Sequence, residues 1–104
     1  MSTKDYFRNS GELKKEFGAM TVAMFLRAFR EADGESQTVF AKRLGLSRAN
    51  LCDLEKGRKL ISIERAVKLA KLLGVPETVL VKLAVRDGLR KAKLRYDVEL
   101  KAAS

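Results

Sequence analysis

The side chains best suited to chemistry in this 104-residue chain are cations, and they are concentrated in one stretch. Between Lys42 and Lys71 there are nine lysines and arginines against three acidic residues, so this stretch carries +6 of the total formal charge of +9. Guanidinium and ammonium groups bind phosphate oxygens, and arginine also binds guanine through two hydrogen bonds. A cationic cluster on a folded domain therefore indicates a polyanionic partner, most commonly a nucleic acid.

Residues that other chemistries need are missing. The sequence has no histidine, which removes the most common general base and the most common metal ligand. Cys52 is the single cysteine, so no internal disulfide and no cysteine-based zinc site can form, which suits a reducing compartment. We find no glycine-rich phosphate loop and no carboxylate pair suited to a catalytic cleft. We therefore expect a protein that is not an enzyme and uses no cofactor or metal.

The cationic residues need an element to position them, and a pair of short helices meets that need. Ser36 and Ser47 are good N-caps, and Gly45 and Gly57 stand where helices end in a left-handed residue. The sequence therefore predicts two short helices joined by residues 45–47. Such a turn sets the second helix roughly perpendicular to the first and points its N-terminal end outward, where it can enter a DNA major groove.

Three further helices are predicted around this pair, because apolar residues recur there at helical spacing. Thr21 and Ser62 are candidate N-caps for two of them, and Asp87-Gly88 is the predicted stop of the last. No segment shows a convincing period-two alternation, so no strand is predicted. The three predicted helices span about residues 21–32, 63–73 and 76–86.

The expected architecture is all-α. A five-helix domain covers residues 21–88, a short N-terminal arm covers 1–20, and a basic, amphipathic C-terminal tail covers 89–104. The apolar residues of the tail that fall roughly in line are Leu89, Ala92, Tyr96 and Leu100.

One pattern of residues extends over more than half of the chain. Its members are Leu26, Arg30, Gln37, Phe40-Ala41, Gly45-Leu46-Ser47, Leu51, Leu54-Glu55-Lys56-Gly57, Leu69-Ala70 and Leu72-Leu73-Gly74-Val75. Over about residues 26–83 the chain resembles the phage-repressor/Cro-type (XRE) helix-turn-helix family. The resemblance implies a five-helix fold and sequence-specific binding of double-stranded DNA by a transcriptional repressor or autoregulator. Such proteins usually bind pseudo-palindromic sites as dimers.

The resemblance also implies roles for single residues. Gln37 matches a residue at the start of the first helix of the pair that holds a DNA phosphate, which helix N-termini favour. The exposed start of the second helix matches base-reading positions, where Arg48 suits guanine and Asn50 suits adenine or a phosphate. The implied base contacts are Ser47, Arg48, Ala49 and Asn50, and the implied phosphate contacts are Gln37, Lys56, Arg58 and Lys59.

Three further charged residues, Arg30, Glu55 and Asp53, are not assigned a DNA contact. Arg30 and Glu55 match an ion pair that orients the second helix of the pair against the preceding helix, so we assign them a structural role and no DNA contact. Asp53 lies on the exposed side, where the family often has a neutral or longer side chain. A carboxylate there would sit near phosphates, so Asp53 is the position that fits the resemblance least well.

The last predicted helix offers a surface for a second copy. Val79, Leu80 and Leu83 can close the core from one face, which leaves Val81 and Val85 on another face. A helix that is apolar on two sides is usually buried on both. We therefore predict a homodimer with Val81 and Val85 in its interface. The alternative is that the arm or the tail covers these valines within one chain.

Two functions remain open for such a DNA-binding protein. It is a stand-alone regulator, or it is an antitoxin of the HigA type that also binds a protein toxin and represses its own operon. The arm and the tail give room for a toxin and equally suit a stand-alone regulator. The first residues are polar and no stretch is long and apolar enough to span a bilayer, so we expect a cytoplasmic protein that associates with the nucleoid and not with a membrane.

Overall fold

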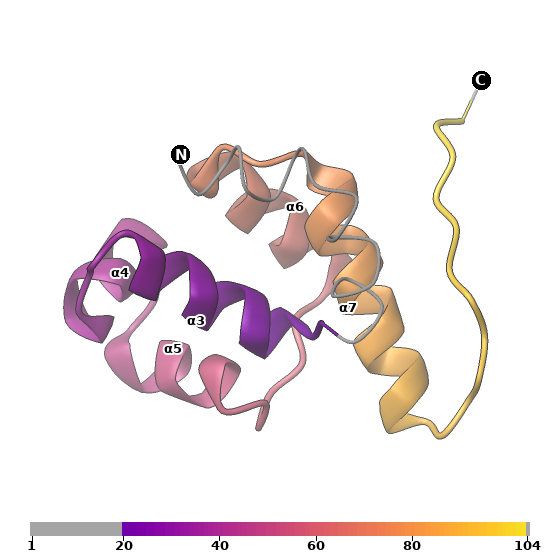
Figure 1. Ribbon diagram of the computed structural model, residues 1–104, viewed down its shortest axis with the longest axis horizontal. Helices are drawn as coiled ribbons and strands as arrows, with labels where there is room; N and C mark the ends of the chain where they lie inside the picture. Colours follow the sequence, from indigo (N-terminus) through magenta and orange to yellow (C-terminus); the bar gives the residue numbers. More distant parts are fainter. Residues whose placement is uncertain (1–19, 104) are drawn as a thin grey trace.

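The computed structural model describes residues 20–103, which fold into five α-helices around one apolar core (Figure 1). No strand occurs among these residues, so the predicted all-α, five-helix fold is confirmed. The predicted arm lies outside the described residues except for Met20, which is buried. The helices are α3 (Val22–Ala32), α4 (Gln37–Arg43), α5 (Arg48–Glu55), α6 (Ile63–Leu73) and α7 (Glu77–Lys91).

Short polar side chains start four of the five helices. The hydroxyl oxygens of Thr21, Ser36, Ser47 and Ser62 each accept a hydrogen bond from the backbone N–H of the residue three positions further along. A cap of this kind contributes about 1 kcal/mol. No side-chain cap starts α7, which begins directly after Pro76, whose fixed φ suits a helix start. The predicted N-caps are therefore the observed ones.

The turn between α4 and α5 depends on Gly45. This residue has a φ of +68°, a left-handed conformation that is costly for any residue with a Cβ. Its N–H donates to the carbonyl of Lys42, and the N–H of Leu46 donates to the carbonyl of Ala41 at 2.8 Å. Ala41 is buried where α4 packs against α5. The turn thus sends the chain into α5 with the first turn of that helix at the surface.

The core is built around α3, which packs against both α5 and α7. Three phenylalanines form its centre: the ring of Phe29 lies 6.1 Å from that of Phe25 and 6.2 Å from that of Phe40. Leu51 and Leu54 of α5 are buried against this centre. Because protein interiors are closely packed, these contacts fix the position of α5 relative to α3.

Helix α7 runs further than the sequence predicts. The predicted end at Arg86, before Asp87-Gly88, is wrong, because the helix continues to Lys91. Asp87 has a partner elsewhere in the fold: its Oδ2 accepts a hydrogen bond from the backbone N–H of Val22, the first residue of α3, at 3.0 Å. A tertiary contact thus overrides the local stop signal, and Gly88 is tolerated inside the helix at a cost of about 1 kcal/mol.

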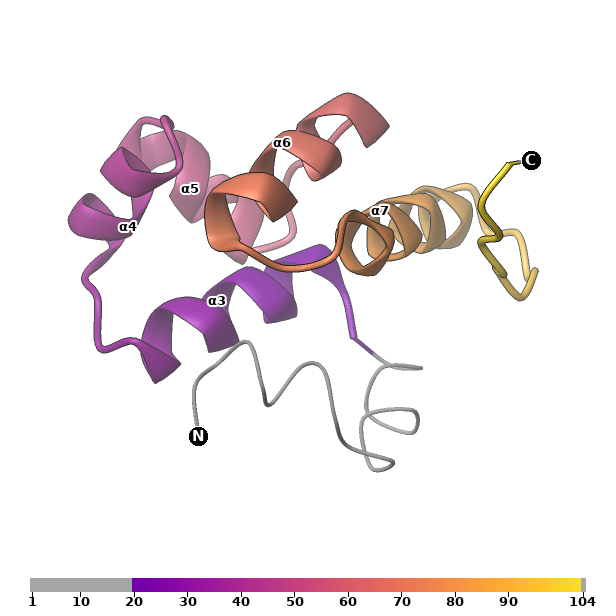
Figure 2. The same ribbon diagram turned by 90° about the horizontal axis from the view of Figure 1, so that it is seen from above.

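The tail after α7 is not helical. Lys93 has a φ of +60° and ends the helix, and residues 94–103 form neither helix nor strand. The expectation that Leu89, Ala92, Tyr96 and Leu100 fall in line is therefore wrong, because the chain leaves the helix before Tyr96. Figure 1 shows the tail leaving the end of α7 as one open stretch, and Figure 2 shows it at the opposite end of the molecule from α4.

Candidate nucleic-acid interface

The first turn of α5 is the part of the helix pair that solvent reaches. Ser47, Arg48, Ala49 and Asn50 are all exposed, whereas the inner side of the helix is buried. The Ser47 hydroxyl accepts the backbone N–H of Asn50 at 3.1 Å, which holds the start of the helix in shape. The structure therefore brings together all four residues that the sequence assigned to base contacts.

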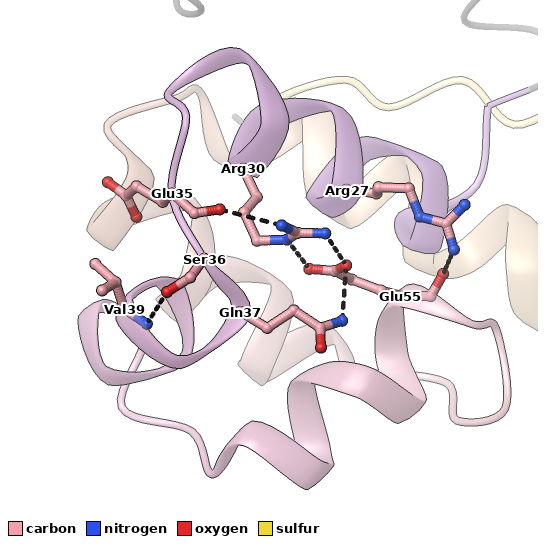
Figure 3. Close-up of polar contacts among 7 residues, drawn as sticks. All are labelled: Arg27, Arg30, Glu35, Ser36, Gln37, Val39 and Glu55. Atoms are coloured by element: carbon pink, nitrogen blue, oxygen red, sulfur yellow. Dashed lines mark hydrogen bonds and ion pairs between the residues drawn. The ribbon is translucent and has the colours of Figure 1, made fainter.

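A two-point ion pair ties α5 to α3. Arg30 donates from Nε to Glu55 Oε2 at 2.8 Å and from Nη2 to Oε1 at 2.9 Å, and its Nη1 donates to the carbonyl of Glu35 at 3.1 Å (Figure 3). The Glu55 side chain is only 1% exposed. Its hydrogen bonds raise the pKa of Arg30, against the opposing effect of burial. Two parallel bonds fix direction as well as distance, so this pair sets the orientation of α5.

Gln37 joins the same carboxylate from α4. Its side-chain Nε2 donates to Glu55 Oε1 at 3.3 Å, so Glu55 links α3, α4 and α5 (Figure 3). An amide nitrogen carries two hydrogens, and this contact uses one of them. The residue that the resemblance assigned to a phosphate is therefore half-buried and oriented by the protein itself.

Asp53 lies among the cations that follow α5, a contact that sequence reasoning missed. Its Oδ1 is 3.5 Å from Arg58 Nη1 and its Oδ2 is 3.6 Å from Lys59 Nζ. Lys59 Nζ also donates to Asn50 Oδ1 at 3.0 Å. The loop returns over the exposed side of α5 because Gly57 adopts a φ of +72°, which directs the Arg58 N–H to the Asp53 carbonyl at 2.9 Å. A glycine C-cap followed directly by cations is the sequence signal that could have revealed this cluster.

The family of the chain follows from a comparison with protein-family models. The model of the helix-turn-helix domain matches residues 21–83, which is more than half of the chain and includes the α4–α5 pair. This protein belongs to the helix-turn-helix domain family. Membership supports DNA as its partner and transcription regulation as its role. A search of curated proteins and a search of solved structures each gave no match.

Not every cation of this helix-turn-helix domain is available to DNA. Arg43 donates to Asp33 at 3.1 Å and to Glu35 at 2.7 Å, and its guanidinium carbon lies 5.6 Å from the centre of the Phe29 ring. Arg43 therefore holds α3 and α4 together. Arg58 and Lys59 also have an acidic neighbour, Asp53, but their side chains are 64% and 54% exposed, against 35% for Arg43. Lys56 is exposed in the same loop.

Residues 20–103 contain no group of three or more histidine, cysteine, aspartate or glutamate side chains that could hold a metal ion. Among the described helices, none combines the length and the apolar character that crossing a bilayer requires.

Proposed function

We propose that this protein is a sequence-specific repressor or autoregulator of the phage-repressor/Cro (XRE) type, with the first turn of α5 in the major groove. The observation that carries the proposal is that Ser47, Arg48, Ala49 and Asn50 are exposed together on a helix whose direction Glu55 fixes. A preset direction lowers the cost of ordering these side chains on DNA. In this pose Arg48 is suited to bind guanine and Asn50 to bind adenine or a phosphate.

The backbone contacts in this proposal flank the reading turn. Gln37 stands at the first residue of α4, where the helix N-terminus favours a phosphate. Lys56, Arg58 and Lys59 follow α5 and are exposed, so they are suited to the phosphates beside the same groove. These contacts position the protein without reading sequence, and the base contacts supply the specificity.

The proposed active form is a homodimer, with Val81 and Val85 of α7 in the interface. Both valines are half-buried in the single chain, and Val81 packs in part against the core. Two copies related by a two-fold axis would read two half-sites about one helical turn apart on a pseudo-palindromic operator. Such a repressor acts in the cytoplasm, on the DNA of the nucleoid, and has no catalytic step.

Selection of bound fragments from the parent genome tests the proposal and gives the site, its symmetry and its target together. We expect a pseudo-palindrome, bound with an affinity that falls steeply between about 50 and 200 mM salt, because phosphate contacts release counterions. Indifference to salt over that range would show that the phosphate contacts are wrongly assigned.

Arg48→Ala tests the base contact at the same operator. We expect a loss of about 1–3 kcal/mol that is confined to one base position, because a bidentate contact to guanine is removed. An equal loss on random DNA would instead make Arg48 a backbone contact.

The second candidate function is that of an antitoxin of the HigA type, which would bind a protein toxin and repress its own operon. The observation that favours it is the tail, which carries exposed Leu94, Tyr96 and Leu100 outside the helix pair. A short neighbouring reading frame that encodes a ribonuclease, and a stable complex of the two proteins, would support this function. The DNA-reading surface is the same in both cases.

A further inference from the structure

The tail carries a pattern that none of the proposed contacts uses. Residues 93–101 alternate strictly between charged and apolar side chains, which is the pattern of a β-strand with one apolar face. The charged residues are Lys93, Arg95, Asp97, Glu99 and Lys101, and the apolar residues are Leu94, Tyr96, Val98 and Leu100.

Beyond Leu94, the backbone of this strand-like segment pairs with no other stretch of the described residues. The backbone of residues 95–103 makes no hydrogen bond to any other described residue. Tyr96 is 68% exposed and Leu94 is 47% exposed. The left-handed Lys93 ends α7 and separates the segment from the helix. An unpaired strand with an apolar face is a template for pairing with another chain.

The charges of the segment are complementary to themselves in one antiparallel register. With a two-fold axis at Tyr96, Arg95 faces the partner's Asp97 and Lys93 faces the partner's Glu99. The symmetry repeats both pairs, so four opposite-charge pairs form and no like charges meet within the ribbon. A register centred on Arg95 places that cation opposite its own copy, and a register centred on Asp97 does the same for that carboxylate.

The apolar side of the same register also matches. Leu94 faces the partner's Val98, and Tyr96 faces the partner's Tyr96 across the axis. Aromatic and branched side chains are the residues that stabilise cross-strand pairs. An isologous contact of this kind, in which one patch meets its own copy, is the form that a two-fold dimer requires.

We propose that residues 94–98 form an antiparallel, two-stranded β-ribbon with the same residues of a second copy, with the two-fold axis at Tyr96 and with Lys93 and Glu99 at its ends. The proposal deepens the homodimer of the proposed function and rests on it. A two-stranded ribbon alone is marginally stable. The segment follows α7 directly, so the ribbon would add to the proposed α7 interface with Val81 and Val85 and would not have to hold the dimer alone.

A charge swap in the full chain, without DNA, tests the ribbon by its mass in sedimentation equilibrium. Arg95→Glu turns two attractive pairs into repulsive ones, so we expect the dimer dissociation constant to rise by about tenfold or more. The double variant R95E/D97R restores both pairs at the wild-type net charge, and we expect it to restore the wild-type constant. Lys101→Glu is the matched control, because it makes the same change of charge in the same tail and Lys101 faces no acidic residue of the second copy in this register. Its 3.8 Å contact with Glu99 lies within one chain, and both side chains are about 80% exposed.

Three outcomes would overturn the ribbon. The first is an R95E dimer as tight as that of the wild type, and the second is a double variant that stays dissociated. The third is a wild type that is monomeric at every concentration, which would overturn the proposed homodimer as well. A dimer that survives R95E and is lost in Val85→Glu would overturn the ribbon alone and leave the α7 interface of the proposed function standing.

Discussion

Asp53 reduces the positive charge of the surface that is proposed to face DNA. Its carboxylate lies 3.5 Å from Arg58 and 3.6 Å from Lys59, two of the cations proposed to bind phosphate. Exposed ion pairs contribute little to stability, about 0–1 kcal/mol, so a stabilising role does not account for the cluster. In the proposed complex, both cations would exchange this partner for a phosphate. This exchange would lower the affinity for every DNA sequence. Base contacts would then account for a larger share of the preference for the operator over random DNA.

Asp53→Asn should therefore strengthen binding to random DNA more than binding to the operator. The variant removes the competing charge, so we expect the slope of log affinity against log salt to steepen by about one unit. Fluorescence anisotropy with random and selected duplexes measures both effects. Asp33→Asn makes the same charge change beside Arg43 and away from the loop, and should leave the slope at its wild-type value. An unchanged affinity of D53N for random DNA would show that Asp53 does not compete.

Arg30 and Arg48 should respond in opposite ways to loss of the side chain. Arg30→Ala leaves Glu55 buried without its main partner, and breaking such a pair costs about 3–5 kcal/mol. Arg48→Ala should change the free energy of unfolding by less than about 0.5 kcal/mol, because Arg48 is exposed. Urea unfolding of both variants makes the comparison. An R30A protein as stable as R48A would mean that water replaces Arg30 at Glu55.

The ion pair between Arg30 and Glu55 was predictable because both positions match the pair that the family resemblance implies. The structure contains this pair, at 2.8 and 2.9 Å. The Asp53 cluster depends on the path of the chain after Gly57, which brings Lys59 back to Asn50 at 3.0 Å. A path of that kind follows from the left-handed turn and from packing, so the sequence pattern alone did not show it.

At the scale of elements, α7 shows how a tertiary contact changes a local preference. An Asp-Gly pair is a strong turn signal, yet the carboxylate of Asp87 binds the first N–H of α3 and stays within a helix. In the tail the prediction failed in the opposite direction, because a helical spacing was expected where the chain is not helical. Tyr96 and Leu100 fit a helical spacing, but they also belong to the alternating segment 93–101, and short apolar patterns fit both periods.

Substitution of Asp87 should separate its hydrogen bond from its charge. Asp87→Ala removes the acceptor for the Val22 N–H, and we expect a loss of about 1 kcal/mol in the free energy of unfolding at pH 7. Asp87→Asn retains an acceptor oxygen and avoids burying a charge, so it should be at least as stable as the wild type. Thermal or urea unfolding at one pH ranks the three proteins. A D87N protein less stable than D87A would contradict the claim that Asp87 stabilises the fold through its hydrogen bond and not through its charge.

The pH dependence of the same variants follows from the raised pKa of Asp87. Burial raises this pKa, and the Val22 N–H and two nearby arginines lower it by less. The unfolded chain therefore releases the proton at a lower pH than the folded protein, so rising pH favours unfolding of the wild type between the two pKa values. D87N lacks this proton. Its stability advantage should grow from the ordinary aspartate pKa up to the raised pKa and then stay constant, which unfolding curves at several pH values will show.

At the scale of the whole molecule, the surface proposed to read DNA and the surface proposed to form the dimer lie on different elements. A shallow hollow lined by Arg58, Lys59, Asp87, Arg90 and Lys91 joins the loop after α5 to the C-terminal end of α7. The cationic surface therefore extends from the helix pair to the helix that carries the proposed interface. A dimer formed through α7 and the tail would place two such surfaces about one two-fold axis, as a pseudo-palindromic site requires.

Val85→Glu tests whether this dimer supplies the operator affinity. A buried, unpaired charge at the α7 interface should give a monomer, and loss of the second half-site should weaken operator binding by about 10²–10⁴-fold. Binding to a single half-site should stay near the wild-type value, because Arg48 and the loop cations are intact. Leu72→Glu is the control, since Leu72 is 48% exposed on α6 and lies in no proposed contact. If V85E stays dimeric with full operator affinity, the α7 face lies outside the interface, and the ribbon formed by residues 94–98 must then hold the two copies together without it.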